Sequence, residues 1–180
     1  VQGLGVLIFP SAFAGVGFGW LLPGPAYAAK LHGVTSLFHL LGAGLAYALL
    51  SLSLAQALLL HLHDRDLKRK RAGGFFKSFP PIQTMENVLF QMVYLGFALL
   101  TLTLLSGALS SGKMFGQALL FNHHTVLALL AWISLAVLVL GRLLLGWRGR
   151  AAVLWTGLGF FLLATGYFGT RFVLEILLAP

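Results

Sequence analysis

The stretch SLFHLLGAGLAYALLSLSLAQALLLHLHDRDLKRKR (residues 36–71) decides the fold of this chain. Residues 36–60 carry no Lys, Arg, Asp or Glu, and about 20 predominantly apolar residues are enough for a helix to cross a bilayer. The tract HDRDLKRKR (63–71) follows at once, and a basic tract beside an apolar span is typical of a helix end that meets anionic headgroups. The stretch therefore indicates a transmembrane helix with a basic anchor at one end.

The whole chain has the composition of a membrane protein. It is 59% hydrophobic and only 9% charged, whereas soluble domains carry about 25% charged residues. We predict an all-α, polytopic helical membrane protein with about five transmembrane helices, which lie near 3–22, 34–62, 87–109, 122–145 and 151–178. We expect Pro10 and the neighbouring glycines to kink the first span or make it re-entrant. The longest connection, 63–86, is too short for a soluble domain, so residues 1–180 are expected to form a single membrane domain.

The basic residues predict how the chain is oriented. Of its twelve Lys and Arg, six lie in segment 63–86 and three in segment 142–150. The positive-inside rule places both segments in the cytoplasm, with the N-terminus inside and the C-terminus outside. Because the same rule explains the sequence pI of about 10.5, we expect the lipid bilayer, and not nucleic acid, to be the partner of this charge.

Four of the six histidines fall at the opposite, non-cytoplasmic face: His32, His39, His123 and His124. His39 is embedded in the apolar run, and polar groups inside a membrane tend to be functional. His123 and His124 are adjacent, about 100° apart on a helix, so we expect only one of them to face the bundle and leave open which. His61 and His63, beside the basic tract, are expected at a solvated helix end.

Imidazole is a good ligand for iron, and two axial histidines from facing helices are one way in which a helical bundle holds haem. We therefore predict His39 and His124 as a candidate pair of haem-iron ligands, with His123 as the substitute if the fourth span is rotated by one residue. Small residues allow close approach of helices in membranes, so we also expect Gly42 and Ala46 to meet a neighbouring helix.

The chain resembles the cytochrome c assembly protein family (the CcsA/HemX-like proteins) over residues 36–174. The resemblance rests on MENVLFQMVYLGFALLTLTLLSGAL (85–109), AWISLAVLVLGR (131–142) and GWRGRAAVLWTGLGFFLLATGYFGTRFVL (146–174). It is nearest to the small YpjD-like members of the bacterial inner membrane, which implies a multi-pass protein of that membrane. In this resemblance His39 takes the place of an external haem-ligand histidine of the family.

Two departures qualify what the resemblance implies. The segment LFNHHT (120–125) stands where full haem-handling members carry a WDxKE motif, and the chain ends at EILLAP (175–180) without a second external histidine. We therefore expect binding or handling of haem b at the non-cytoplasmic face, with cytochrome-maturation proteins or a larger membrane complex as partners, and no enzymatic activity. A non-catalytic scaffold or accessory subunit is the alternative, and a metal-cation or solute transport factor is a less favoured one.

Overall fold

The computed structural model describes residues 34–68, 80–115 and 123–172, with side chains at 37–68, 80–108 and 125–166. Within these ranges the chain forms four helices: α2 (Val34–Lys68), α3 (Ile82–Phe115), α4 (His123–Leu145) and α5 (Arg150–Phe172). The predicted all-α class is therefore confirmed. The predicted first span, 3–22, and the end of the last predicted span lie outside the described residues.

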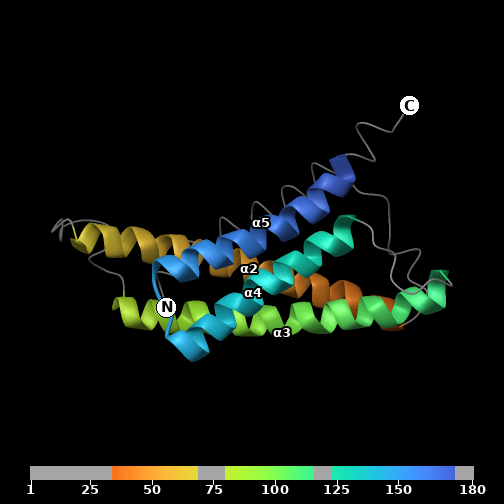
Figure 1. Cartoon of the computed structure of the whole chain (residues 1–180), viewed down its shortest axis with the longest axis horizontal. Coiled ribbons are helices and arrows are strands. Elements are labelled where there is room, and N and C mark those ends of the chain that lie inside the picture. Colours follow the sequence, from red (N-terminus) through yellow and green to blue (C-terminus); the bar gives the residue numbers. More distant parts are fainter. Residues whose placement is uncertain (1–33, 69–79, 116–122, 173–180) are drawn as a thin grey trace.

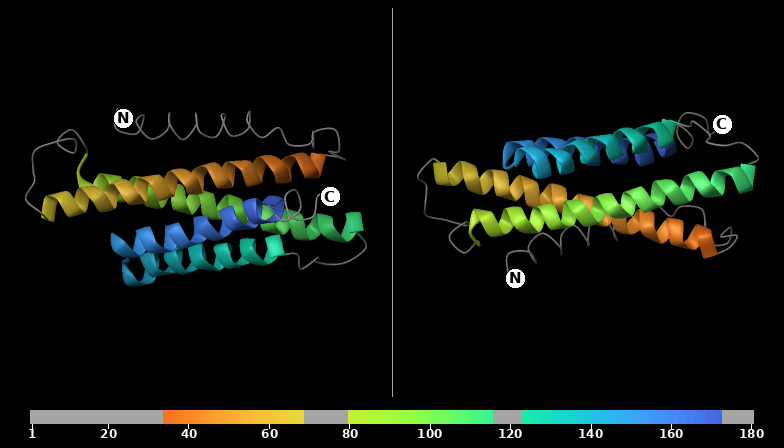
Figure 2. Two further views of the ribbon diagram at one scale, coloured as in Figure 1. Left: turned by 90° about the horizontal axis from the view of Figure 1, so that it is seen from above. Right: turned by 60° about the horizontal axis from the view of Figure 1, so that its bottom comes forward.

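The helices run up and down and pack as two antiparallel pairs (Figure 1). One pair is α2 with α3, the other is α4 with α5, and α5 lies along α2 while α4 lies along α3 (Figure 2). As a result, the end of α2, the start of α3 and the α4–α5 turn share one end of the bundle. We call this the basic end, because it holds Arg65, Lys68, Arg142, Arg148 and Arg150; the opposite end is called the His39 end.

Two helices are longer at the basic end than the apolar runs predicted. Helix α2 continues from 62 to Lys68, where Lys68 and Asp64 form an ion pair between residues four apart, a spacing that stabilises helices. Helix α3 begins at Ile82 and not near 87, because the carbonyl of Pro81 accepts hydrogen bonds from the N–H groups of Thr84 and Met85. Proline suits this position, because its missing N–H is not needed at a helix start.

Three described segments are long and apolar enough to cross a membrane: Leu37–Lys68, Ile82–Ala108 and Thr125–Leu145. Helix α5 is apolar over a shorter described stretch, Arg150–Gly166. Large apolar side chains also point outward from the bundle, among them Leu144, which is 77% exposed, and Phe161, which is 66% exposed. Such outward apolar surface suits lipid contact, whereas the number of five spans and their orientation remain predictions.

Small residues lie where the helices approach one another. A Cβ on Gly96 of α3 would lie 3.0 Å from the Leu50 side chain of α2, and one on Gly159 of α5 would lie 2.9 Å from Leu135 of α4. On α2, Ala46 is buried and a Cβ on Gly42 would lie 3.3 Å from Thr103 Oγ1 of α3. The prediction that Gly42 and Ala46 meet a neighbouring helix is confirmed.

Candidate functional site

His39 lies on the face of α2 that packs against α3. Its Nδ1 atom is 2.8 Å from the hydroxyl oxygen of Ser106, and the side chain is partly buried. A histidine at a membrane interface often tips its polar end toward water. Here the ring is instead bound to a neighbouring helix, so its orientation is set by the packing of α2 on α3.

Two further residues of α3 complete the surroundings of the imidazole. A Cβ on Gly107 would lie 3.2 Å from His39 Cε1, so the absence of a side chain there leaves room for the ring. The hydroxyl of Ser106 lies 2.9 Å from the carbonyl oxygen of Thr103 and donates a hydrogen bond to it. The Nδ1–Cε1 edge of the imidazole therefore lies against a short segment of α3 that is shaped for it.

His123 and His124 form the start of α4, which lies at the same end of the bundle as His39 (Figures 1 and 2). The structure describes the side chains of α4 only from Thr125 onward. The arrangement therefore places both residues at the predicted end, while the choice between them as a second ligand remains a prediction. His32 lies outside the described residues.

Helix α4 contacts α3 through Trp132, about two and a half turns after the start of α4 at His123. The indole N–H of Trp132 donates a hydrogen bond of 2.9 Å to Thr101 Oγ1, and the indole stacks on Phe97 with ring centroids 5.5 Å apart. A buried tryptophan usually finds such a partner for its N–H. This contact holds α4, whose first turn contains His123 and His124, against α3, the helix whose Ser106 contacts His39.

The expectation that His63 lies at a solvated helix end was wrong. His63 is only 7% exposed, and its Nδ1 atom lies 3.4 Å from the sulfur of Met85. The reason is that α2 continues as a helix beyond 62, which keeps His63 on the face that packs on α3. His61 lies on another face of α2 and lines a pocket at the basic end.

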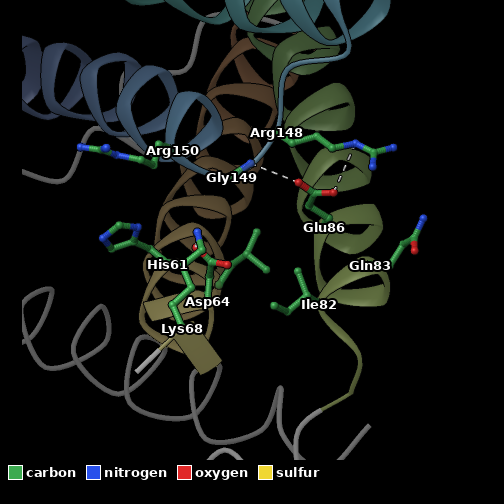
Figure 3. A pocket seen from close by; sticks show the side chains of 10 residues that line it. His61, Asp64, Lys68, Ile82, Gln83, Glu86, Arg148, Gly149 and Arg150 are labelled. Carbon is green, nitrogen blue, oxygen red and sulfur yellow. Dashed lines mark hydrogen bonds and ion pairs between the residues drawn. The ribbon is translucent and has the colours of Figure 1, made fainter. Parts of the chain in front are cut away.

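Glu86 is the centre of a polar cluster at the basic end (Figure 3). Its Oε1 atom accepts a hydrogen bond of 3.1 Å from the Gly149 N–H, and its Oε2 atom lies 3.7 Å from Arg148 Nε and 4.0 Å from Arg142 Nη1. The guanidinium of Arg142 also stands 4.3 Å from the ring centroid of Phe90. We call Glu86, Arg142, Arg148 and Gly149 the Glu86 cluster.

The turn between α4 and α5 is shaped for this cluster. Gly146 and Gly149 have φ angles of 65° and 51°, a left-handed conformation that glycine adopts without steric cost. Trp147 folds back over α4: its backbone N–H donates a hydrogen bond of 3.1 Å to the Gly141 carbonyl, and its indole stacks on Trp155. Glu86 was not among the candidate site residues predicted from the sequence.

A pocket of about 420 Å³ lies at the basic end, between α2, the start of α3 and the α4–α5 turn (Figure 3). Its two carboxylates are already engaged, Glu86 with the arginines of its cluster and Asp64 with Lys68. The pocket is therefore part of a structural polar network, and it lies at the opposite end of the bundle from His39.

The sequence pattern of a family described as Cytochrome C assembly protein matches residues 5–178. The chain is similar to the inner membrane protein YpjD of Escherichia coli K12, with 33% identity over 132 residues, which is 73% of this chain and 49% of that protein. It is also similar to a 28.8 kDa protein of Azospirillum brasilense, with 27% identity over 87% of this chain and 58% of that protein. No solved structure matches the chain.

A third relative is the cytochrome c biogenesis protein CcsA of Marchantia polymorpha, with 29% identity over 96 residues, 53% of this chain and 30% of that protein. The chain thus spans about half the length of the first curated relatives that it matches. The apolar helices and the similarity to an inner membrane protein together identify a multi-pass protein of the inner membrane.

Proposed function

Because the chain belongs to the cytochrome c assembly protein family, we propose that it binds haem at the His39 end of the bundle, with His39 as an axial ligand of the iron. The charge asymmetry of the loops supports a location of this end on the non-cytoplasmic side. Haem b is the form proposed, because the chain has no cysteine and a thioether-linked haem needs a CxxCH motif.

The observation that carries the proposal is the fixed orientation of His39. Its ring is held at Nδ1 by Ser106 and rests on Gly107, and metal-binding histidines are generally oriented by a hydrogen bond at the ring nitrogen that does not bind the metal. Beside it, Phe38 is 70% exposed and Leu41 is 56% exposed. An imidazole next to accessible apolar surface fits an iron porphyrin, which needs a nitrogen ligand and apolar contacts.

A second axial ligand is proposed from the start of α4. Both candidates belong to the first turn of α4, which starts at the His39 end. His124 is the preferred residue, and His123 is its substitute if α4 is rotated by one residue. Bound there, the haem would be an iron porphyrin ready for transfer to cytochrome-maturation proteins, which are the proposed partners. In this role the chain binds and presents its ligand and is not itself an enzyme.

The test is the absorbance spectrum of the purified protein, with pyridine-haemochrome quantification. We expect a b-type haem in the wild type, its loss in His39→Ala, and a changed spin state or weaker retention in His124→Ala. The matched control is His61→Ala, on the same helix at the basic end, which should keep the wild-type haem content. Full haem retention with an unchanged spectrum in the double variant His39→Ala/His124→Ala would exclude this site.

A scaffold or accessory-subunit role is the second candidate function. It is favoured by the exposed apolar end of α4, where Leu143, Leu144 and Leu145 are each at least 67% exposed. This apolar surface suits a partner helix as well as lipid. This role predicts co-purification with a larger complex and no bound haem. A transport role is less favoured, because Glu86, the buried carboxylate of the described spans, is engaged by Arg142 and Arg148.

A further inference from the structure

The hydroxyl of Ser106 lies between two groups, and its single proton can serve only one of them. Its oxygen is 2.8 Å from His39 Nδ1 and 2.9 Å from the Thr103 carbonyl oxygen. A carbonyl only accepts hydrogen bonds, whereas a neutral imidazole nitrogen either donates or accepts. Both short contacts are hydrogen bonds only when Ser106 donates to Thr103 and Nδ1–H of His39 donates to Ser106.

The opposite arrangement satisfies fewer groups. If the proton of the imidazole were on Nε2, the Ser106 hydroxyl would have to donate to Nδ1, and its contact with the Thr103 carbonyl would no longer be a hydrogen bond. A partly buried polar contact that is left unmade costs free energy. The Ser106–Thr103 pair therefore favours one tautomer of His39, the one with its proton on Nδ1.

We propose that Ser106 is a positioning residue that holds His39 as the Nδ1–H tautomer and so leaves the Nε2 lone pair free to bind haem iron. The inference rests on the proposed function for its ligand, but the tautomer itself is a property of the protein without haem. The nitrogen that binds a metal is set by the hydrogen bond that the other nitrogen makes. Such a partner orients the ring and raises its basicity as a ligand.

The neighbours of Ser106 support this assignment. Gly107 admits the Nδ1–Cε1 edge of the ring to the surface of α3, since a Cβ there would lie 3.2 Å from Cε1. The hydroxyl of Thr103 is bound to the Leu99 carbonyl at 2.7 Å, so it does not compete for the imidazole. The segment Thr103–Gly107 thus offers His39 one acceptor, at Nδ1.

The experiment compares Ser106→Ala with Ser106→Thr, which keeps a hydroxyl. The control is Ser51→Ala, because the Ser51 hydroxyl makes the same kind of local hydrogen bond, 2.8 Å to the Ala48 carbonyl three residues back. Ser51 lies on α2 about three turns from His39, so its loss should not affect the imidazole. The first readout is nitrogen NMR of ring-labelled histidine in the haem-free protein at about pH 9, where ordinary imidazoles are neutral. The His39 signal is the one missing from His39→Ala.

We expect the wild type, Ser51→Ala and Ser106→Thr to show the Nδ1–H form at His39, and Ser106→Ala to show a mixture of tautomers. The second readout is haem binding, where Ser106→Ala should weaken haem affinity about tenfold or more, the usual effect of losing such a partner. Its bound haem should also have a higher reduction potential, because a less basic ligand stabilises ferric iron less.

The outcomes separate this inference from the proposed function. An Nε2–H form of His39 in the wild type overturns the inference, whether or not Ser106→Ala folds. Unchanged tautomer, affinity and potential in Ser106→Ala, together with loss of haem in His39→Ala, also overturn it and leave the proposed function standing. If the wild-type protein shows the Nδ1–H form of His39 but fails to bind added haem, the proposed function alone is overturned.

Discussion

The carboxylate of Glu86, in the first turns of α3, accepts a hydrogen bond from the backbone N–H of Gly149, which lies 63 residues later in the α4–α5 turn. Gly149 has a φ angle of 51°, and this conformation directs its N–H at the carboxylate. Arg142 and Arg148 lie near the other carboxylate oxygen. One acidic side chain therefore fastens the second helix pair to the first at the basic end.

Removing Glu86 should destabilise the fold. The side chain of Glu86 is 8% exposed and that of Arg142 16%, so Glu86→Ala leaves a nearly buried guanidinium without its counter-charge. We expect a loss of about 3 kcal/mol in the free energy of unfolding, the low end for breaking a buried pair. Unfolding by SDS titration in mild detergent measures it, and Glu86→Gln, which retains an acceptor for Gly149, should lose less.

The two arginines of the Glu86 cluster should contribute differently to the free energy of unfolding. Arg142 also donates to the Trp147 carbonyl at 3.0 Å and stands over Phe90, whereas the Arg148 side chain is 61% exposed. Exposed ion pairs contribute about 0–1 kcal/mol, so Arg148→Ala should have little effect and Arg142→Ala a clearly larger one. Equal losses in the same SDS titration would contradict the contacts assigned to Arg142.

The small-residue face of α2 gives a matched pair of variants. A Cβ on Gly42 would lie 3.3 Å from Thr103 Oγ1, whereas a Cβ on Gly44 meets nothing within 4 Å. Gly42→Leu should therefore separate α2 from α3 and cost about 1–3 kcal/mol. Gly44→Leu should be neutral or slightly stabilising, because leucine is a better helix former than glycine. Thermal unfolding in detergent compares them, and a Gly42→Leu protein as stable as Gly44→Leu would show that this face does not pack.

The orientation of the bundle can be tested by cysteine labelling, since the chain has no cysteine of its own. The exposed residues Lys68 and Arg148 lie at the basic end, so Lys68→Cys and Arg148→Cys should react only with reagent that enters the cytoplasm. Lys113→Cys, near the other end of α3, should react from outside. If residue 68 or 148 reacted only with reagent outside the cell, the true orientation would be the reverse of the predicted one, and His39 would lie in the cytoplasmic half.

Much of the fold could be predicted from composition and periodicity. Long apolar runs without charges located α2 to α5, and the matched family agrees with the resemblance recognised over 36–174. The helix ends were less predictable, since an ion pair between Asp64 and Lys68 extends α2 and the Pro81 carbonyl starts α3 early. These contacts involve polar and backbone groups outside the apolar runs, so a hydropathy pattern does not predict the helix ends that they set.

The site could be predicted only in part, because its remaining residues depend on how two helices are aligned. His39 stood out as a polar group in an apolar run. Ser106 lies 67 residues away, and nothing in the sequence specifies which turn of α3 faces His39. The burial of His63 against Met85 depends on the same alignment. The Glu86 cluster was missed because the predicted span began at 87, which left Glu86 in a loop. Only the earlier start of α3 at Ile82 places this carboxylate in a helix, where it requires basic partners such as Arg142 and Arg148.

The most direct test of the central claim is chemical rescue of His39→Gly. The substitution removes the proposed imidazole ligand and leaves space beside Ser106 and Gly107, so free imidazole should enter and restore the b-type absorbance spectrum when haem is added. Wild type and His61→Gly should bind haem without added imidazole. A His39→Gly protein that binds haem as the wild type does, or whose haem spectrum is the same with and without imidazole, would contradict the assignment of His39 as the haem-iron ligand.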